Sequence, residues 1–121
     1  MEHTFWFITG SQHLYGPETL RQVKENSIMI ARALDENQRI SGKVVFKAVV
    51  TTAEEISGVI GEAGNDPDCA GIITWMHTFS PSQMWIPGLS VNRKPWLHFH
   101  TQFNRDIPWE TIDMDFMNLN Q

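Results

Sequence analysis

Four short apolar runs, each followed directly by polar residues, most constrain what this chain can fold into. The runs cover residues 5–8, 43–50, 70–76 and 95–99. Runs of this length and composition predict strands that are buried on both faces, as in a parallel sheet. Because the carboxyl ends of parallel strands lie along one edge, we expect the polar loops at 10–16, 51–52, 77–80 and 100–103 to converge on one crevice, where such sheets bind ligands.

Helical patterns separate the predicted strands. Apolar residues recur near helical spacing over 18–37, and Pro17 fits the first turn of that helix. Thr52 and Glu55 have the spacing of a capping box, which predicts a second helix ending near Ala63. Alternating strands and helices imply right-handed crossovers, and therefore a three-layer α/β/α fold with a mostly parallel sheet.

The second half of the chain has weaker helical signals. Ser80 followed by Pro81 predicts a brief helix toward Ile86, which Pro87 and Gly88 should stop. Residues 107–121 carry apolar residues at roughly helical spacing, but they also contain a proline and a polar end. The sequence therefore does not decide the secondary structure of this segment. The chain also stops without a helix cap or terminal strand, so we expect residues 1–121 to be a domain cut from a larger unit.

The composition indicates the cellular compartment of the protein and excludes some classes of binding partner. A length of 121 residues suggests one domain, and a formal charge of −5 without a basic cluster argues against nucleic acid. The lone cysteine, Cys69, is expected to be a reduced, buried thiol, which favours the cytoplasm. The amino-terminal apolar stretch is too short for a signal peptide or a membrane span.

The loops lack the sequence signatures of nucleotide binding and of a catalytic nucleophile. Gly10 and Gly16 do not have dinucleotide-binding spacing, and no phosphate-binding G-K-[ST] sequence occurs. Binding of a phosphate group at residues Thr9 to Ser11, as in flavodoxins, remains an alternative. Cys69 precedes a strand and Ser11 lacks a nucleophile elbow, so neither is expected to be a nucleophile.

Four histidines fall at or near the predicted strand ends: His13, His77, His98 and His100. They have neither a helical pair spacing nor a carboxylate partner, so we expect no metal to be bound by this chain alone. The alternative is that they form hydrogen bonds with neighbouring loops and fix their shape. The late acidic residues Asp106, Glu110, Asp113 and Asp115 are spaced like a solvated face.

Aromatic residues are numerous near the same edge and are compatible with a sugar site. Their rings could stack on a sugar while Gln12 and Gln102 bind hydroxyl groups, or the rings could simply belong to the core. Trp75 and Trp96 are assigned to the core. The remaining candidates are Tyr15, Phe79, Trp85, Phe103 and Trp109.

Four long motifs resemble a known family. Residues 10–20, 75–81, 99–104 and 113–121 are similar, in order, to the N-terminal region of L-arabinose isomerases. The resemblance implies a flavodoxin-like, fucose-isomerase-type sheet within a cytoplasmic, hexameric enzyme several times longer than this chain. Such enzymes interconvert L-arabinose and L-ribulose, and D-galactose and D-tagatose, with Mn²⁺.

The resemblance also implies that the catalytic residues and the residues of this chain belong to different domains of the enzyme. The family's metal-binding and proton-transfer residues lie in later domains, so this chain alone should be inactive, with no catalytic or metal-binding residue of its own. Five positions are implied to line or adjoin the sugar pocket of a neighbouring subunit: Gln12, Leu14, Tyr15, Phe79 and Gln121.

Two other classes remain as alternatives. The chain could be a non-catalytic oligomerisation or sugar-binding module, or a flavodoxin-like cofactor binder. If the family's sheet continues past Gln121, this piece would leave a sheet edge and apolar surface uncovered, so we expect it to associate with itself or with the remaining isomerase domains.

Overall fold

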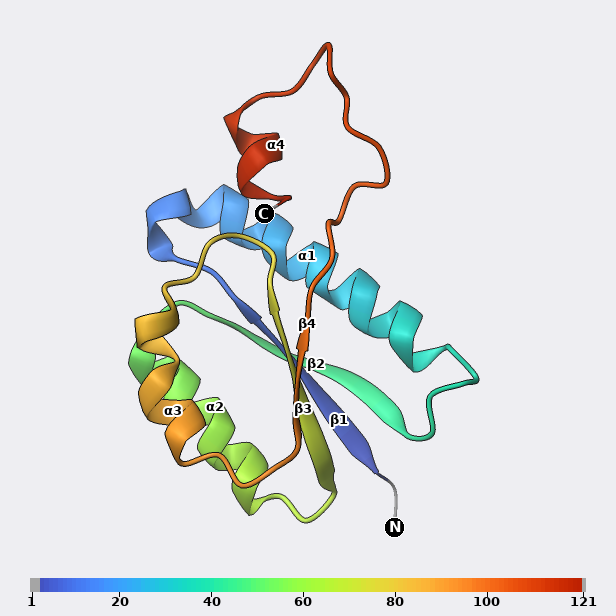
Figure 1. Ribbon diagram of the computed structural model, residues 1–121, viewed down its shortest axis with the longest axis vertical. Helices are drawn as coiled ribbons and strands as arrows, with labels where there is room; N and C mark the ends of the chain where they lie inside the picture. Colours follow the sequence, from blue (N-terminus) through green and yellow to red (C-terminus); the bar gives the residue numbers. More distant parts are fainter. Residues whose placement is uncertain (1–2, 121) are drawn as a thin grey trace.

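The computed structural model describes residues 3–120, and a parallel sheet forms the middle of that part of the molecule (Figure 1). The sheet has four strands in the order β2-β1-β3-β4. Their bounds are Thr4–Gly10 for β1, Lys43–Val50 for β2, Cys69–Met76 for β3 and Trp96–Phe99 for β4. This is the flavodoxin-like order, which reverses direction between β1 and β3, so the predicted α/β class is confirmed.

Helices cover both faces of the sheet and make the fold three-layered (Figure 1). One face packs against α1, and the other packs against α2 and α3, which contact each other. The helices are α1 (Gly16–Asp35), α2 (Ala53–Asn65), α3 (Ile86–Ser90) and α4 (Met114–Asn118), with 3₁₀ turns η1 (His13–Tyr15) and η2 (Ser82–Met84).

Alternating side chains of β1 divide the core into two clusters. Trp6 and Ile8 pack toward α2 and α3, whereas Phe5 and Phe7 pack toward α1. Successive side chains of a strand point to opposite faces, so one central strand supplies both layers of core. The continuous apolar sequence of this strand follows from its central position.

Two helices follow the sequence prediction with shifted ends. Helix α1 begins and ends two residues before the predicted bounds, and Pro17 lies in its first turn as predicted. The predicted cap of α2 is confirmed, because Thr52 Oγ1 accepts a hydrogen bond from the Glu55 backbone N–H at 3.1 Å. This helix continues past Ala63 to Asn65 before the chain turns toward Pro67.

The predicted helix from Ser80 toward Ile86 is wrong. That stretch contains only the 3₁₀ turn η2, and the helix α3 follows it with Pro87 in the first turn. A proline there sacrifices no helical hydrogen bond, because the first-turn N–H groups have no partner within the helix. Pro87 therefore starts a helix instead of stopping one. In residues 107–120 the helical spacing produces only the short α4.

The assignment of Trp96 to the core is also wrong, whereas that of Trp75 is confirmed. Trp75 is fully buried on β3, but Trp96 is 50% exposed on β4. Strand β4 lies at the edge of the sheet, and within residues 3–120 it pairs only with β3. The indole N–H of Trp96 donates to Thr74 Oγ1 at 2.8 Å, which fixes the ring without burying it.

Cys69 is buried at the start of β3, as predicted. Burial raises the pKa of its thiol, and the thiol donates to the Gly71 carbonyl at 3.4 Å. Within residues 3–120, no helix has the length and hydropathy needed to cross a bilayer.

Candidate functional site

The polar loops after the strands do meet at the carboxyl edge of the sheet. We call residues 10–16, 51–52, 77–80 and 100–103 the rim. Ser11 Oγ and Thr78 Oγ1 lie 2.5 Å apart, both fully buried, and join the loops after β1 and β3. These are the two strands between which the sheet order reverses, the place where folds of this type bind ligands.

Gln12 and Phe79 lie together at the same junction. The Gln12 side-chain N–H donates to the Phe79 carbonyl oxygen at 3.2 Å, and the Phe79 ring is 53% exposed. The loops approach so closely that a Cβ on Gly10 would lie 2.5 Å from Met76 Sδ and 2.9 Å from Ser80 Cβ. Because Gly10 has no Cβ, the loop after β1 can approach the loop after β3 this closely.

Leu14 and Tyr15 continue this surface on the turn η1. The Tyr15 backbone N–H donates to the Gln12 carbonyl at 3.3 Å and closes the turn. Leu14 is 82% exposed and Tyr15 is partly buried. Four of the five predicted pocket positions thus lie in two neighbouring loops, and Gln121 lies outside the described residues.

A second set of contacts joins the loops after β1 and β2. His13 Nε2 lies 2.9 Å from Thr51 Oγ1, and the Thr51 hydroxyl donates to Glu55 Oε1 at 2.8 Å. In a standard capping box the glutamate accepts from the N–H of the cap residue, whereas here Glu55 accepts from the hydroxyls of Thr51 and Thr52. The link to His13 joins two segments that no sequence spacing connects.

His77 is a structural residue of the rim. Its ring stacks on Trp75 with centroids 4.3 Å apart, and its Nε2 lies 2.9 Å from Asn26 Nδ2 on α1. Burial lowers the pKa of His77 to about 4, so the ring is neutral at pH 7 and accepts from the Asn26 amide. His98 likewise contacts a neighbouring strand through Thr74 Oγ1, at 3.0 Å from Nδ1.

The described histidine, cysteine and carboxylate groups do not fit a Mn²⁺ site. Within residues 3–120, no three of the histidines, cysteines and carboxylates gather closely enough to hold a metal ion. The side chains of His13, His77 and His98 are instead hydrogen-bonded to Thr51, Asn26 and Thr74. The alternative, that these histidines form hydrogen bonds with neighbouring loops, holds for His13, whereas His77 is bonded to helix α1 and His98 to strand β3.

The hydroxyl groups proposed for a flavodoxin-like phosphate site are used inside the protein. Thr9 Oγ1 donates to Ser27 Oγ at 2.8 Å, and Ser11 is paired with Thr78. Thr9 and Ser11 are both fully buried. Neither hydroxyl is accessible to a phosphate group, which counts against the cofactor-binding alternative.

The other sequence candidates are buried, bonded within their own loop or exposed to solvent. Trp75 and Trp85 are buried, and Gln102 donates to the Asn104 carbonyl in its own loop at 2.8 Å. Asp106, Glu110 and Asp113 are exposed, as expected for a solvated face, and the side chain of Asp115 lies outside the described residues.

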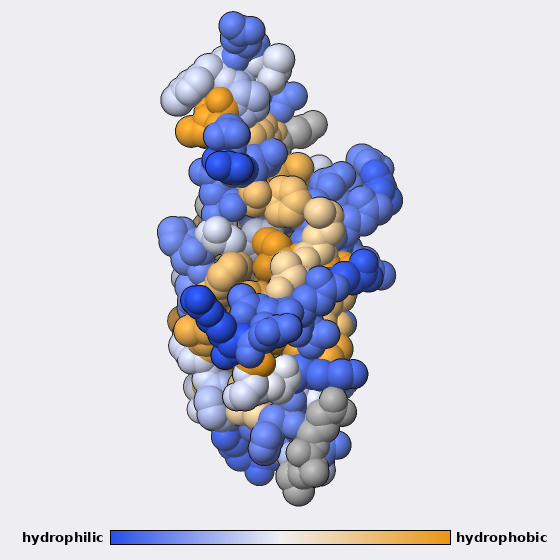
Figure 2. Space-filling model, turned by 90° about the vertical axis from the view of Figure 1, so that its right-hand side faces the viewer, coloured by the Kyte–Doolittle hydropathy of each residue, from blue (hydrophilic) through white to orange (hydrophobic). Residues whose placement is uncertain are grey.

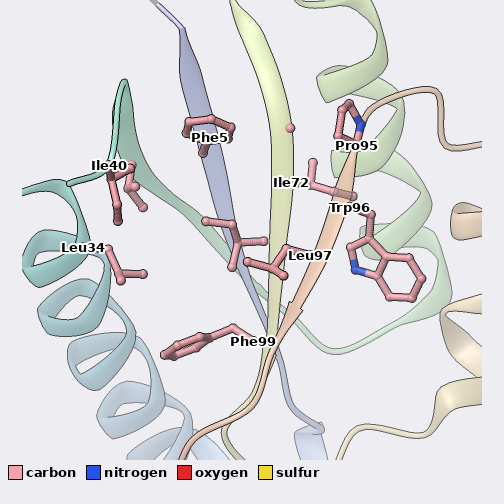
Figure 3. A pocket seen from close by; sticks show the side chains of 11 residues that line it. Phe5, Leu34, Ile40, Ile72, Pro95, Trp96, Leu97 and Phe99 are labelled. Carbon is pink, nitrogen blue, oxygen red and sulfur yellow. The ribbon is translucent and has the colours of Figure 1, made fainter. Parts of the chain in front are cut away.

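An apolar groove of about 440 Å³ lies away from the rim, between α1 and β4. Figure 3 shows Leu97 and Phe99 pointing across it toward Leu34 and Ile40, while the Trp96 ring points to the opposite side. Figure 2 shows this side of the molecule with hydrophobic residues across its middle, bordered by hydrophilic ones. We call this groove and the outer edge of β4 the β4 flank; few polar groups line it, unlike a sugar site.

Comparison with known proteins identifies the family. A family model described as the L-arabinose isomerase N-terminal domain matches residues 1–121. The chain belongs to this family. The L-arabinose isomerase of Geobacillus stearothermophilus is 63% identical over 119 residues, which are 98% of this chain and 24% of that protein. That of Thermotoga maritima is 54% identical over 120 residues, 99% of this chain and 24% of that protein.

The family assignment confirms the resemblance read from the motifs. L-arabinose isomerase 1 of Bacillus licheniformis is 60% identical over 119 residues that cover 98% of this chain and 24% of that protein. The chain therefore spans about a quarter of the length of the L-arabinose isomerases that it matches.

Proposed function

We propose that this chain is the N-terminal domain of an enzyme that converts L-arabinose to L-ribulose, and D-galactose to D-tagatose, and that its rim lines the sugar pocket. The observation that supports the pocket most is the Gln12 side chain bound to the Phe79 carbonyl beside exposed apolar side chains. Small-molecule sites combine such apolar walls with a few fixed polar groups.

The rim offers a distinct role to each of these residues. The Gln12 amide nitrogen already donates to Phe79, so the amide oxygen is left to accept a hydrogen bond from a sugar hydroxyl. Leu14, Tyr15 and Phe79 provide apolar surface that excludes water from the bound sugar. This surface is open on its outer side, so other polypeptide must complete the pocket.

The metal and the proton-transfer groups belong to other parts of the proposed enzyme. The family uses Mn²⁺, but the donor groups within residues 3–120 do not form a site for it. As the family resemblance implies, we expect the domain alone to be inactive. It acts by positioning and enclosing the sugar, as one wall of a pocket in a cytoplasmic homo-oligomer, a hexamer in the family.

The decisive experiment is a chimera. The matching 119 residues of the Geobacillus stearothermophilus isomerase are replaced by this chain, and ketose formation from L-arabinose and D-galactose is measured with Mn²⁺ present. The chimera is expected to isomerise both sugars, and the 121-residue chain alone to produce no ketose.

Two results would overturn the proposal. One is a chimera that is soluble and assembles like the parent enzyme but lacks activity, which is what a non-catalytic module would give. The other is measurable turnover by the isolated chain, which would mean that it holds catalytic groups of its own.

A further inference from the structure

We propose that His13 is a further sugar-binding residue of the rim, and that Thr51 and Glu55 hold its ring so that Nδ1 accepts a hydrogen bond from a ligand hydroxyl. The inference rests on the proposed function, because it adds a contact to the same pocket. It is carried by the chain of hydrogen bonds that connects these three side chains.

The direction of the hydrogen bond between Thr51 and Glu55 follows from the chemistry of the Glu55 carboxylate. An ionised carboxylate can only accept, so the single hydroxyl proton of Thr51 goes to Glu55 Oε1, 2.8 Å away. Thr51 Oγ1 then has only lone pairs to offer to the imidazole nitrogen 2.9 Å from it. His13 must therefore carry a proton on Nε2.

The carboxylate that sets this direction is itself fixed. Glu55 Oε1 also accepts from the Thr51 backbone N–H and the Thr52 hydroxyl, each at 3.3 Å. The Glu55 backbone N–H in turn donates to Thr52 Oγ1 in the first turn of α2. Thr51 itself is largely buried, which limits the access of water to its hydroxyl, whereas its partners His13 and Glu55 are exposed.

A neutral imidazole with its proton on Nε2 has a lone pair on Nδ1. His13 is exposed, and within residues 3–120 no group is hydrogen-bonded to its Nδ1. The next residue along the chain in one direction is Gln12, whose amide oxygen is also an acceptor, and in the other direction it is the exposed Leu14. Gln12 is hydrogen-bonded to the loop after β3 and His13 to the loop after β2, so these two acceptors at consecutive positions of the loop after β1 suit a polyhydroxy compound, which offers several hydroxyl donors.

The first test separates ligand binding from loop support in the chimeric isomerase. In His13→Gln, the side-chain amide still donates to Thr51 but provides no acceptor at the position of Nδ1. Loss of one such hydrogen bond is expected to raise KM for L-arabinose about fivefold to tenfold, with a smaller fall in kcat. A KM equal to that of the unmutated chimera would reduce His13 to a loop support and overturn the inference.

Variants of Thr51 test the chain of hydrogen bonds that runs from Glu55 through Thr51 to His13, which we call the relay. Thr51→Val removes the hydroxyl that orients His13, so KM is expected to rise at least as much as in His13→Gln. Thr51→Ser keeps the hydroxyl and is expected to recover most of that loss. If valine and serine variants behave alike, the hydroxyl does not orient the ring and the relay is wrong.

A spectroscopic readout keeps the inference independent of activity. Nitrogen-15 chemical shifts of the His13 ring in the 121-residue chain are expected to show the Nε2–H tautomer at neutral pH. A ring protonated on Nδ1 alone would overturn the inference even in an active chimera. An inactive parent chimera, by contrast, would count against the proposed function, while the tautomer would still decide the relay.

Discussion

The rim and the β4 flank are built in opposite ways. At the rim, the buried hydroxyls and rings are paired with one another, and no buried side-chain nitrogen or oxygen within residues 3–120 lacks a partner. On the β4 flank the side chains are apolar and still exposed, with Leu97 60% accessible. The rim is thus shaped by contacts within this chain, whereas residues 3–120 leave the apolar surface of the β4 flank uncovered.

Strand order explains the difference. The rim is centred on β1 and β3, which lie in the middle of the sheet and have a strand on each side. Strand β4 is the last in the sheet, and within residues 3–120 α1 reaches only the near side of the groove beside it. Exposed apolar edges of this kind favour association with further protein.

The largest expected effect concerns the pH dependence of stability and arises at the rim. The pKa of His77 is about 4 in the folded chain and near 6.5 when unfolded. Between these values the unfolded state binds a proton that the folded state excludes, so the free energy of unfolding falls as pH is lowered, by about 3 kcal/mol over the window. Urea unfolding at pH 7 and pH 4 measures this loss.

The variant His77→Gln provides the control for that measurement. Without the imidazole, most of the fall in stability between pH 7 and pH 4 should disappear. A variant with the same pH dependence as the parent would mean that the buried ring does not limit acid stability.

The next effect tests how tightly the loops of the rim approach. Gly10→Ala places a methyl group against Met76 and Ser80, and overpacking of this kind is expected to cost about 2 kcal/mol of unfolding free energy. Gly61→Ala, on the exposed side of α2 with open space around it, should instead stabilise by about 0.5–1 kcal/mol. Equal effects of the two substitutions in urea would contradict the close approach.

The smallest effect on stability should accompany a change in association. Leu97→Lys puts a charge on the β4 flank, and as a surface substitution it is expected to change the unfolding free energy by less than about 0.5 kcal/mol. Sedimentation velocity should show concentration-dependent association of the parent chain that this variant loses. Leu14→Lys, at a still more exposed leucine of the rim, is the control and should associate like the parent; a strictly monomeric parent would remove the basis of the comparison.

The sequence could predict the rim because strands and their ends are local signals. Continuous apolar runs marked all four strands, and parallel pairing then required the loops to meet, which brought Gln12 and Phe79 together. Trp96 was misplaced because burial of a strand residue depends on whether its strand is central or at the edge, which composition does not encode.

The hydrogen bonds that hold the rim together could not be read from spacing. The link from His13 to Thr51 and the pairing of Asn26 with His77 each join segments far apart in the chain. Both depend on the three-dimensional register of loop and helix. A local motif such as the capping box revealed Glu55 as a helix cap, but not its part in orienting a histidine.

The most direct test of the central claim, that the rim forms part of a sugar pocket, is the KM of the chimeric isomerase for L-arabinose after Phe79→Ala. The ring is half exposed, so its loss should leave the fold intact, and removal of a pocket wall is expected to raise KM about tenfold. Met29→Ala, an exposed side chain of α1 away from the rim, should leave KM unchanged. An unchanged KM in Phe79→Ala would contradict the account.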